Sequence, residues 1–502
     1  MIKTDDLLAP RILAGALAVG LAADLLLRVM PLGVNVSLCT VLLLAVGAEL
    51  VREKRLPVSR EARWLALTAL LLAFAFVRRD SRALAALDFL TLIVTLGLTA
   101  AALRGVRLAR LNVVDQVRQV MYSAGHALAD AVPLLARALR ASRQPASASR
   151  SRLGAVLLGA GIATPVLFAF GALFASADPV FGNAMRGAFD FDAGLAISHV
   201  VLVVWFTAIS AGYLSWTILM ANPIPPRAPR IISVTIGAVP ILTGLALTVG
   251  LFALFVAVQA KELFGGTAWV ARAAGPSYAE YARSGFFELL AVAALVLPLL
   301  TLADRALGDH ARADGRRFRG LARTLLLLLS LVILSALNRM RLYVASYGLS
   351  EIRLYATAAM GYVAFLAFWL AARLIRRRRR RFAPGALVAG YVALTAFHVV
   401  NPDALIVRVN LSRATTRPFD AAYATSLSAD AIPALLAGLP ALDPRTRCET
   451  RQHLRRRWLR IDEARTRDWR SLNWARLEEE RLARGWMSIP YVHDCTAPEA
   501  KR

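Results

Sequence analysis

The sequence predicts an all-α integral membrane protein with about eleven transmembrane helices. Of its 502 residues, 58% are hydrophobic, the mean hydropathy is +0.55, and apolar runs of spanning length recur up to residue 400. A soluble domain cannot bury so much apolar surface, whereas about 20 apolar residues in a helix cross a bilayer. The protein has a net charge of +27, and these apolar runs separate its charged residues from one another. We therefore attribute the positive charge to membrane orientation and not to nucleic-acid binding.

The eleven predicted helices are the apolar segments of the chain. They cover residues 12–30, 32–51, 64–77, 83–103, 153–175, 195–219, 231–259, 286–304, 321–338, 354–375 and 383–400. The first segment follows basic residues, as a cleaved signal peptide does, but its length and the apolar segment directly behind it favour an uncleaved helix. The third segment is short, and every later helix reverses direction if it does not span.

Basic residues orient these helices, because Arg and Lys in short loops stay in the cytoplasm. With the N-terminus inside, 31 Lys and Arg residues fall in cytoplasmic segments and 10 in the loops on the other side. The sequence thus predicts four helices in residues 1–110, a cytoplasmic amphipathic segment and linker in 111–152, seven core helices in 153–400, and a small, mainly helical extracytoplasmic region in 401–502.

Four ionisable residues lie within the predicted helices, where an unpaired charge is expensive. Asp24 and Arg28 are four residues apart on one helical face and are expected to neutralise each other. The sequence identifies no partner for Asp88 or His199, so proton transfer and a buried hydrogen-bonded role both remain open. The arginine run 376–381 resembles a nucleic-acid patch, but directly after an apolar helix it indicates contact with anionic lipid headgroups.

Charged and aromatic residues gather at the helix ends that are predicted to face outside. They are Asp178, Tyr278, Glu280, Tyr281, Arg283, Glu288, Arg339, Arg341, Tyr347, Glu351 and Arg353. The positive-inside rule disfavours arginines on this side, and nearby carboxylates explain their presence because they can form ion pairs with them. We therefore expect one shared polar site, which is either a structural ion-pair network or, where an arginine lacks a partner, a binding site for a phosphate or carboxylate.

The cysteines predict a disulfide and no metal site. Cys448 and Cys495 are the only cysteines of the predicted extracytoplasmic region, and thiols in an oxidising compartment pair. The sequence contains no CxxC, HExxH or other His/Cys spacing of a metal site, so we predict neither metal nor cofactor.

Several motifs together resemble an uncharacterised family of bacterial polytopic membrane proteins, known only as a domain of unknown function. The motifs are SADPVF (176–181), YAEYARSGFFEL (278–289), YGLSEIRLY (347–355), NPD (401–403), NLSR (410–413) and SADAIPAL (428–435). The resemblance covers approximately residues 150–480. It implies a multi-pass protein of the bacterial cytoplasmic membrane and implies no catalytic residue.

Three classes of function remain. A sensor or assembly partner, which we favour, binds a ligand or another envelope protein through its outer face and needs no catalytic motif. A transporter of a small or lipid-linked anionic solute needs a polar path, for which Asp88 and His199 are the candidates. A membrane enzyme is less favoured, because no recognisable nucleophile or metal set is present. The expected partners are membrane lipid and, for the first class, another envelope protein.

Overall fold

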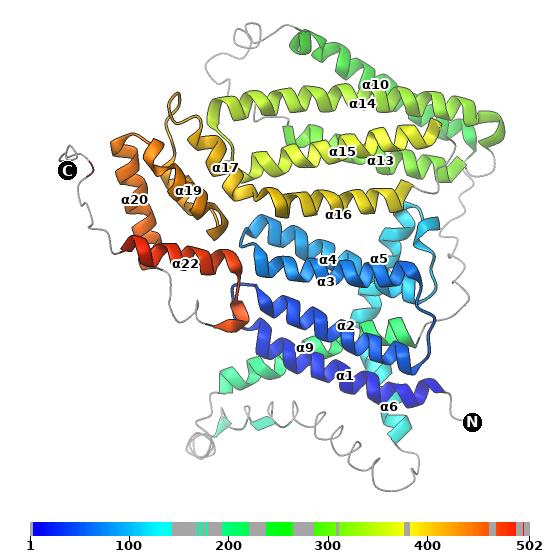
Figure 1. The fold of residues 1–502 in the computed structure, drawn as a ribbon. Coiled ribbons are helices and arrows are strands. Elements are labelled where there is room, and N and C mark those ends of the chain that lie inside the picture. The colour runs from blue at the N-terminus through cyan, green and yellow to red at the C-terminus, as the bar shows by residue number, and fades with distance from the viewer. Residues whose placement is uncertain are drawn as a thin grey trace.

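Among the residues that the computed structural model describes, ten helices of 19 residues or more run back and forth along one direction (Figure 1). They are α1 Thr4–Leu27, α2 Val34–Glu53, α3 Arg60–Arg78, α4 Arg82–Leu103, α9 Ala193–Ile218, α10 Ala238–Phe264, α13 Phe286–Leu307, α14 Ala311–Tyr347, α15 Glu351–Ile375 and α16 Phe382–Val400. The structure describes residues 4–142, 193–219, 237–264, 286–307, 311–375, 382–460 and 468–487, with Cys495 and a few positions between 167 and 178.

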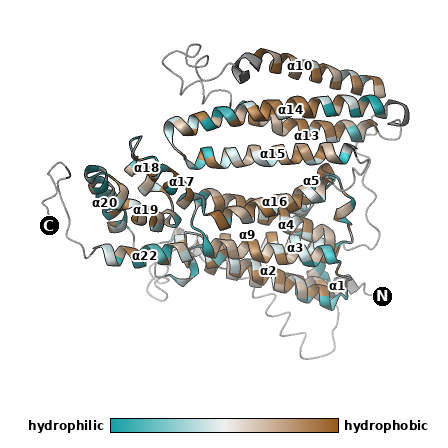
Figure 2. Cartoon of the chain, turned by 45° about the horizontal axis from the view of Figure 1, so that its top comes forward, coloured by the Kyte–Doolittle hydropathy of each residue, from teal (hydrophilic) through white to brown (hydrophobic). Residues whose placement is uncertain are grey.

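These helices confirm the predicted all-α membrane architecture. They match ten of the eleven predicted segments, and the other, 153–175, lies almost entirely outside the described residues. Eight of the described helices are long and apolar enough to cross a membrane. Helix α3 has 19 residues, about 28 Å of helix against the ~30 Å of a hydrocarbon core. Figure 2 shows hydrophobic residues along much of the long helices. Some of their apolar side chains, such as Leu247 and Phe368, are exposed, and lipid is expected to cover them.

Helix α14 shows the largest difference between prediction and structure. It has 37 residues, whereas the apolar run predicts only 321–338. Its charged flanks continue the helix because no proline interrupts them before Gly348. Gly348 has a φ of +78°, the left-handed conformation that commonly ends a helix. Arg339 and Arg341, which we predicted in a connecting loop, therefore belong to α14, where residues two apart point in different directions.

The connections between the helices gather at two opposite ends of the bundle. The start of α1, the α2–α3 connection and the end of α15 lie at one end (Figure 1). The α1–α2, α3–α4 and α14–α15 connections lie at the other end, and the chain from Pro402 to Met487 packs there. We call this second end the C-terminal face. The charge count predicts that it lies outside the cytoplasm.

Short helices form the region on the C-terminal face. They are α17 Pro402–Leu411, α18 Ala421–Ser426, α19 Ile432–Gly438, α20 Pro444–Leu459 and α22 Trp474–Met487. Their side chains surround a core that includes Ile406, Ile432 and Leu454, and Trp458 closes it. Trp469 and Trp474 are instead 57% and 70% exposed. They flank Leu472, whose carbonyl accepts the N–H at the start of α2 (3.0 Å). Exposed tryptophans beside the end of a membrane helix are typical of an aromatic belt, so we expect both to lie near the bilayer surface.

The amphipathic segment after α4 forms α5 Val113–Ala129 and α6 Ala131–Ser142. The two helices separate at Asp130, three residues before Pro133. Pro133 is tolerated because it lies in the first turn of α6, where its missing N–H has no helical partner to lose. Helix α5 crosses the end of the bundle opposite the C-terminal face and packs on α4 and α9 (Figure 1).

A reporter enzyme that is active only in the cytoplasm should be silent when it is fused after Arg502, because the charge count places the C-terminal face outside. The same reporter inserted at Val58, an exposed residue of the α2–α3 connection, should be active. Enzyme activity of the two fusions in whole cells measures this, and the reverse pattern would contradict the orientation.

Candidate functional site

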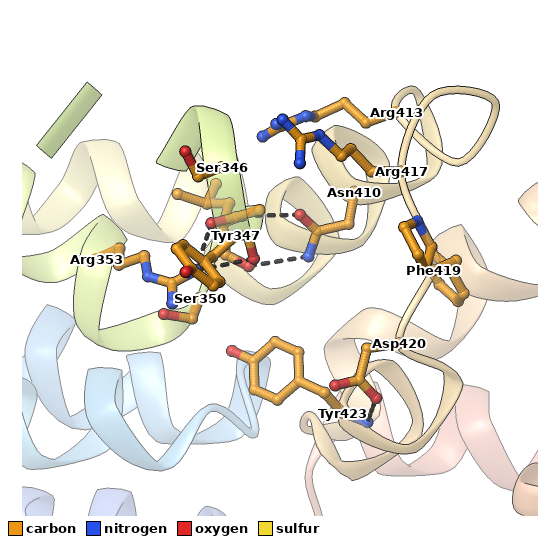
Figure 3. A pocket seen from close by; sticks show the side chains of 13 residues that line it. Ser346, Tyr347, Ser350, Arg353, Asn410, Arg413, Arg417, Phe419, Asp420 and Tyr423 are labelled. Carbon is orange, nitrogen blue, oxygen red and sulfur yellow. Dashed lines mark hydrogen bonds between the residues drawn. The ribbon is translucent and has the colours of Figure 1, made fainter. Parts of the chain in front are cut away.

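A pocket of about 430 Å³ lies on the C-terminal face, between the α14–α15 turn and the segment that joins α17 to α18 (Figure 3). Its size suits a small ligand. Three arginines line it: Arg353 of α15, and Arg413 and Arg417 of the α17–α18 segment. We call it the arginine pocket. Its other lining residues are Ser346, Tyr347, Gly348, Leu349, Ser350, Asn410, Pro418, Phe419, Asp420 and Tyr423.

Asn410 joins the two sides of the arginine pocket. The Leu349 N–H donates to Asn410 Oδ1 (2.8 Å), and Asn410 Nδ2 donates to the Leu349 carbonyl (2.9 Å). A Cβ on Gly348 would lie 2.8 Å from Asn410 Oδ1, so a side chain there would displace the amide. Tyr423 adds a second connection, because its hydroxyl accepts the N–H of Glu351 (2.9 Å).

Two of the arginines also hold the end of α14. Arg353 Nη1 donates to the carbonyls of Tyr347 (3.0 Å) and Gly348 (2.6 Å), and Arg413 donates to carbonyls of the preceding turn. Carbonyls in the last turn of a helix lack helical partners and carry the negative end of the helix dipole. A guanidinium has five N–H donors, so both arginines retain donors beyond these contacts.

The charge around the pocket is positive. The exposed Arg417 side chain forms no hydrogen bond or ion pair with the described residues, and neither Arg353 nor Arg413 pairs with a carboxylate among them. Asp420 is the only carboxylate among the lining residues, and its Oδ1 accepts the Tyr423 N–H (2.8 Å) as the N-cap of α18. Three arginines and one carboxylate give the lining a net positive charge, and like charges around one cavity repel each other.

A second group of charges attaches the C-terminal region to the membrane helices. Arg79 Nη1, in the α3–α4 connection, donates to Asp430 Oδ1 (2.9 Å), and the Asp80 N–H donates to Asp430 Oδ2 (2.6 Å). Arg476 Nη1 of α22 donates to Asp80 Oδ1 (3.0 Å). The Asp430 side chain is 2% exposed and that of Arg79 14%. We call these four residues the docking network.

Burial raises the pKa of two carboxyl groups on the C-terminal face. It raises the pKa of Asp80, although the charge of Arg476 opposes the shift. It raises the pKa of Asp403, in the first turn of α17, to about 6, although Ser428 donates to Asp403 Oδ2. Asp403 Oδ1 has no hydrogen-bond partner in the described structure. Buried carboxyl groups with raised pKa values are common at functional sites.

The four ionisable residues that the sequence places within the membrane helices all have ionisable partners. Arg28 Nε lies 3.6 Å from Asp24 Oδ1, and His199 Nδ1 of α9 lies 2.5 Å from Asp24 Oδ2. Asp88 Oδ1 lies 2.9 Å from His398 Nε2 of α16. The partners of Asp88 and His199 lie 310 and 175 residues away in the sequence, so no spacing rule could identify them.

The structure brings together only part of the predicted polar site. Tyr347 and Arg353 line the arginine pocket, and the backbone of Glu351 is bonded to it through Tyr423. Glu288, Arg341 and Asp178 are exposed outside the pocket lining, and Arg339 lies elsewhere on α14. The other four predicted residues lie outside the described residues: Tyr278, Glu280, Tyr281 and Arg283.

Sequence reasoning missed Arg413 and Arg417, because the tail in which they lie carries many arginines. The motif that contains Asn410 and Arg413 was noticed only for its family resemblance. Asn410 and Arg413 are distinguished by their contacts with the end of α14 and the turn after it, and the groups that they bind lie more than 60 residues away in the sequence. Arg417 lines the same pocket.

Cys448 and Cys495 are joined by a disulfide, with their Cα atoms 5.5 Å apart, within the range that a disulfide bridges. Cys39, in α2, is a free thiol. Among the described residues, no group of three or more His, Cys, Asp or Glu side chains is arranged to hold a metal ion.

Comparison with known proteins gives one match. Residues 66–438 match the family model described as Domain of unknown function (DUF4153). The motifs suggested a resemblance over residues 150–480. The match begins earlier, within α3, and it ends earlier, with α19 and before α20 and α22. No curated protein and no solved structure matches the chain. The matched region contains the whole arginine pocket and covers well over half of the chain, which therefore belongs to the DUF4153 family.

Proposed function

We propose that this multi-pass membrane protein is a sensor or assembly partner in the bacterial envelope that binds an anionic ligand in the arginine pocket, outside the cytoplasm. The observation that carries the proposal is the convergence of Arg353, Arg413 and Arg417 on one cavity without a carboxylate partner among the described residues. Guanidinium groups match the oxygens of phosphate and carboxylate groups, which are the ligand classes that we propose.

The position of the pocket suits a sensor. One wall belongs to the membrane helices α14 and α15, and the other to the region on the C-terminal face. An anion that engages Arg413 competes with the carbonyls at the end of α14 for the same donors. Ligand binding therefore favours an arrangement in which Arg413 no longer holds the end of α14. The ligand shifts the equilibrium between the two arrangements by the difference in its affinity for them.

The arrangement of ionisable residues favours binding over transport. Asp88 lies six residues from the start of α4, and His199 six residues from the start of α9, so both lie about 9 Å along the helix from the C-terminal face. Each is paired there with a group on a neighbouring helix. A transporter needs polar groups along its path across the bilayer, and these described pairs supply them at one end only.

Inorganic phosphate should bind saturably to the purified protein in nanodiscs, as measured by isothermal titration calorimetry. Replacing Arg417 by Gln should weaken binding by about 10- to 150-fold, because a charge-assisted hydrogen bond contributes about 1.5 to 3 kcal/mol. Arg408→Gln is the matched control, because Arg408 is exposed on α17 and does not line the pocket. If wild-type protein does not bind phosphate, or if the two variants bind it equally well, the pocket is not an anion site.

A further inference from the structure

A second cavity, of about 890 Å³, is an open, largely apolar groove between α15 and α16. It runs along both helices, from Ala358 and Ala396 to Arg373 near the end of α15 and Ala109 of the chain after α4, and it shares no lining residue with the arginine pocket. The remaining lining residues are Ala358, Gly361, Tyr362, Phe365, Trp369, Pro384, Gly385, Val388, Ala389, Val392, Ala393 and Ala396.

The groove is open over part of its length, and its length suits a hydrocarbon chain. Small residues form much of its length, and a Cβ on Gly361 would meet no other atom within 4 Å, so this part of the groove is open. The two helices touch beside it, where Tyr362 Oη donates to the Ala386 carbonyl (2.8 Å). From Ala358 to Arg373 the helix rises about 22 Å, more than the ~15 Å thickness of one hydrocarbon leaflet.

Charge marks one end of the groove. The Arg373 guanidinium lies 4.2 Å from the centre of the Trp369 ring and forms no ion pair with the described residues. Trp369 and Arg373 are the residue types that lie at the headgroup level of a membrane. In sequence, Arg373 is followed closely by the six arginines 376–381, and clusters of this kind attract anionic lipids at a cytoplasmic surface.

We propose that the groove binds one acyl chain of an anionic membrane phospholipid, with the lipid phosphate at Arg373. An apolar channel longer than a leaflet accommodates a chain, and an arginine without a carboxylate partner at its mouth selects the negative headgroup. The inference is independent of the arginine pocket, since the two cavities share no lining residue.

Photo-crosslinking tests this proposal on the full chain in nanodiscs. Phosphatidylglycerol and phosphatidylcholine, each with a diazirine in one acyl chain, are compared by mass spectrometry of the labelled α15 and α16 peptides. In wild-type protein, phosphatidylglycerol should label these peptides about fivefold more than phosphatidylcholine, the preference that one cation near an anionic surface provides. In Arg373→Gln the ratio should fall to about one. Equal labelling by the two lipids in wild-type protein would overturn the proposed headgroup selection.

A variant whose groove is filled by a larger side chain provides the second test of the proposal. Gly361→Leu places a side chain in the open part of the groove, and Gly250→Leu in α10 is the matched control, because a Cβ there also meets no atom within 4 Å. Leucine favours a helix more than glycine does, so both variants should fold. Gly361→Leu should lose labelling of α15 and α16 by both lipids, and Gly250→Leu should keep it. Unchanged labelling in Gly361→Leu would show that the chain does not occupy the groove.

Discussion

Asp430→Ala should lower the free energy of unfolding by about 3 to 5 kcal/mol, because it leaves the guanidinium of Arg79 buried without its counter-ion. The two side chains meet at 2.9 Å, and Asp430 also accepts the Asp80 N–H, so the substitution removes an ion pair and a backbone contact together. Unfolding in a denaturant series, followed by circular dichroism in detergent micelles, measures the loss. Asp430→Asn retains an acceptor and should lose less.

Glu449→Ala is the matched control for Asp430→Ala. Glu449 pairs with Arg445 in the same region, but this pair is exposed, and exposed pairs within one helix contribute only about 0.3 to 0.5 kcal/mol. If Asp430→Ala were no less stable than Glu449→Ala, the docking network would not hold the C-terminal region on the membrane helices.

Asp403→Asn should stabilise the protein at neutral pH by about 3 kcal/mol. Burial raises the pKa of Asp403 from 3.8 to about 6. Between these values the folded protein binds more protons than the unfolded chain, so stability falls as pH rises through this window. Above pH 6 Asp403 is ionised, and the full cost of burying its charge lowers the stability of the wild-type protein. Asparagine carries no charge and removes this cost. The gain of the variant should therefore be largest at pH 7 to 8 and vanish near pH 4.

Thermal unfolding midpoints of the wild-type protein and of Asp403→Asn, recorded between pH 4 and 8, measure the difference in their stability. Asp443→Asn is the control, because the pKa of the exposed Asp443 is lowered by the Thr446 N–H, so its substitution should give no gain at high pH. A gain for Asp403→Asn that does not change with pH would show that Asp403 is not charged at pH 7. A protein that retains a destabilising carboxylate commonly does so for its function.

The sequence predicts the membrane helices well because a spanning helix needs a long apolar run, which is a local property. Helix ends are less well predicted, since charged residues outside the bilayer continue a helix as readily as they form a loop. Arg339 and Arg341 illustrate this point, because they extend α14 beyond its apolar run. The pair Asp24 and Arg28 could be predicted, as helical spacing alone places both residues on one face.

The candidate site could be predicted only in part. Tyr347 and Arg353 lie near each other in sequence, and both line the arginine pocket. The partners in the docking network lie hundreds of residues apart, as Arg79 and Asp430 show, and long-range packing that brings them together leaves no periodic signal in one sequence. The contact of Arg413 with the end of α14 could not be predicted for the same reason, because only the folded structure brings the two together.

Labelling of a cysteine in the arginine pocket tests the central claim most directly, namely an anion site that faces outside the cytoplasm. Ser346→Cys is introduced in a Cys39→Ser background, where the other two cysteines form the disulfide. In intact cells, a membrane-impermeant maleimide should label Cys at 346, and added phosphate should slow the labelling. A cysteine at Val58, at the opposite end of the bundle, should be labelled only in permeabilised cells. Labelling at 346 that requires permeabilisation, or a rate that phosphate leaves unchanged, would contradict the account.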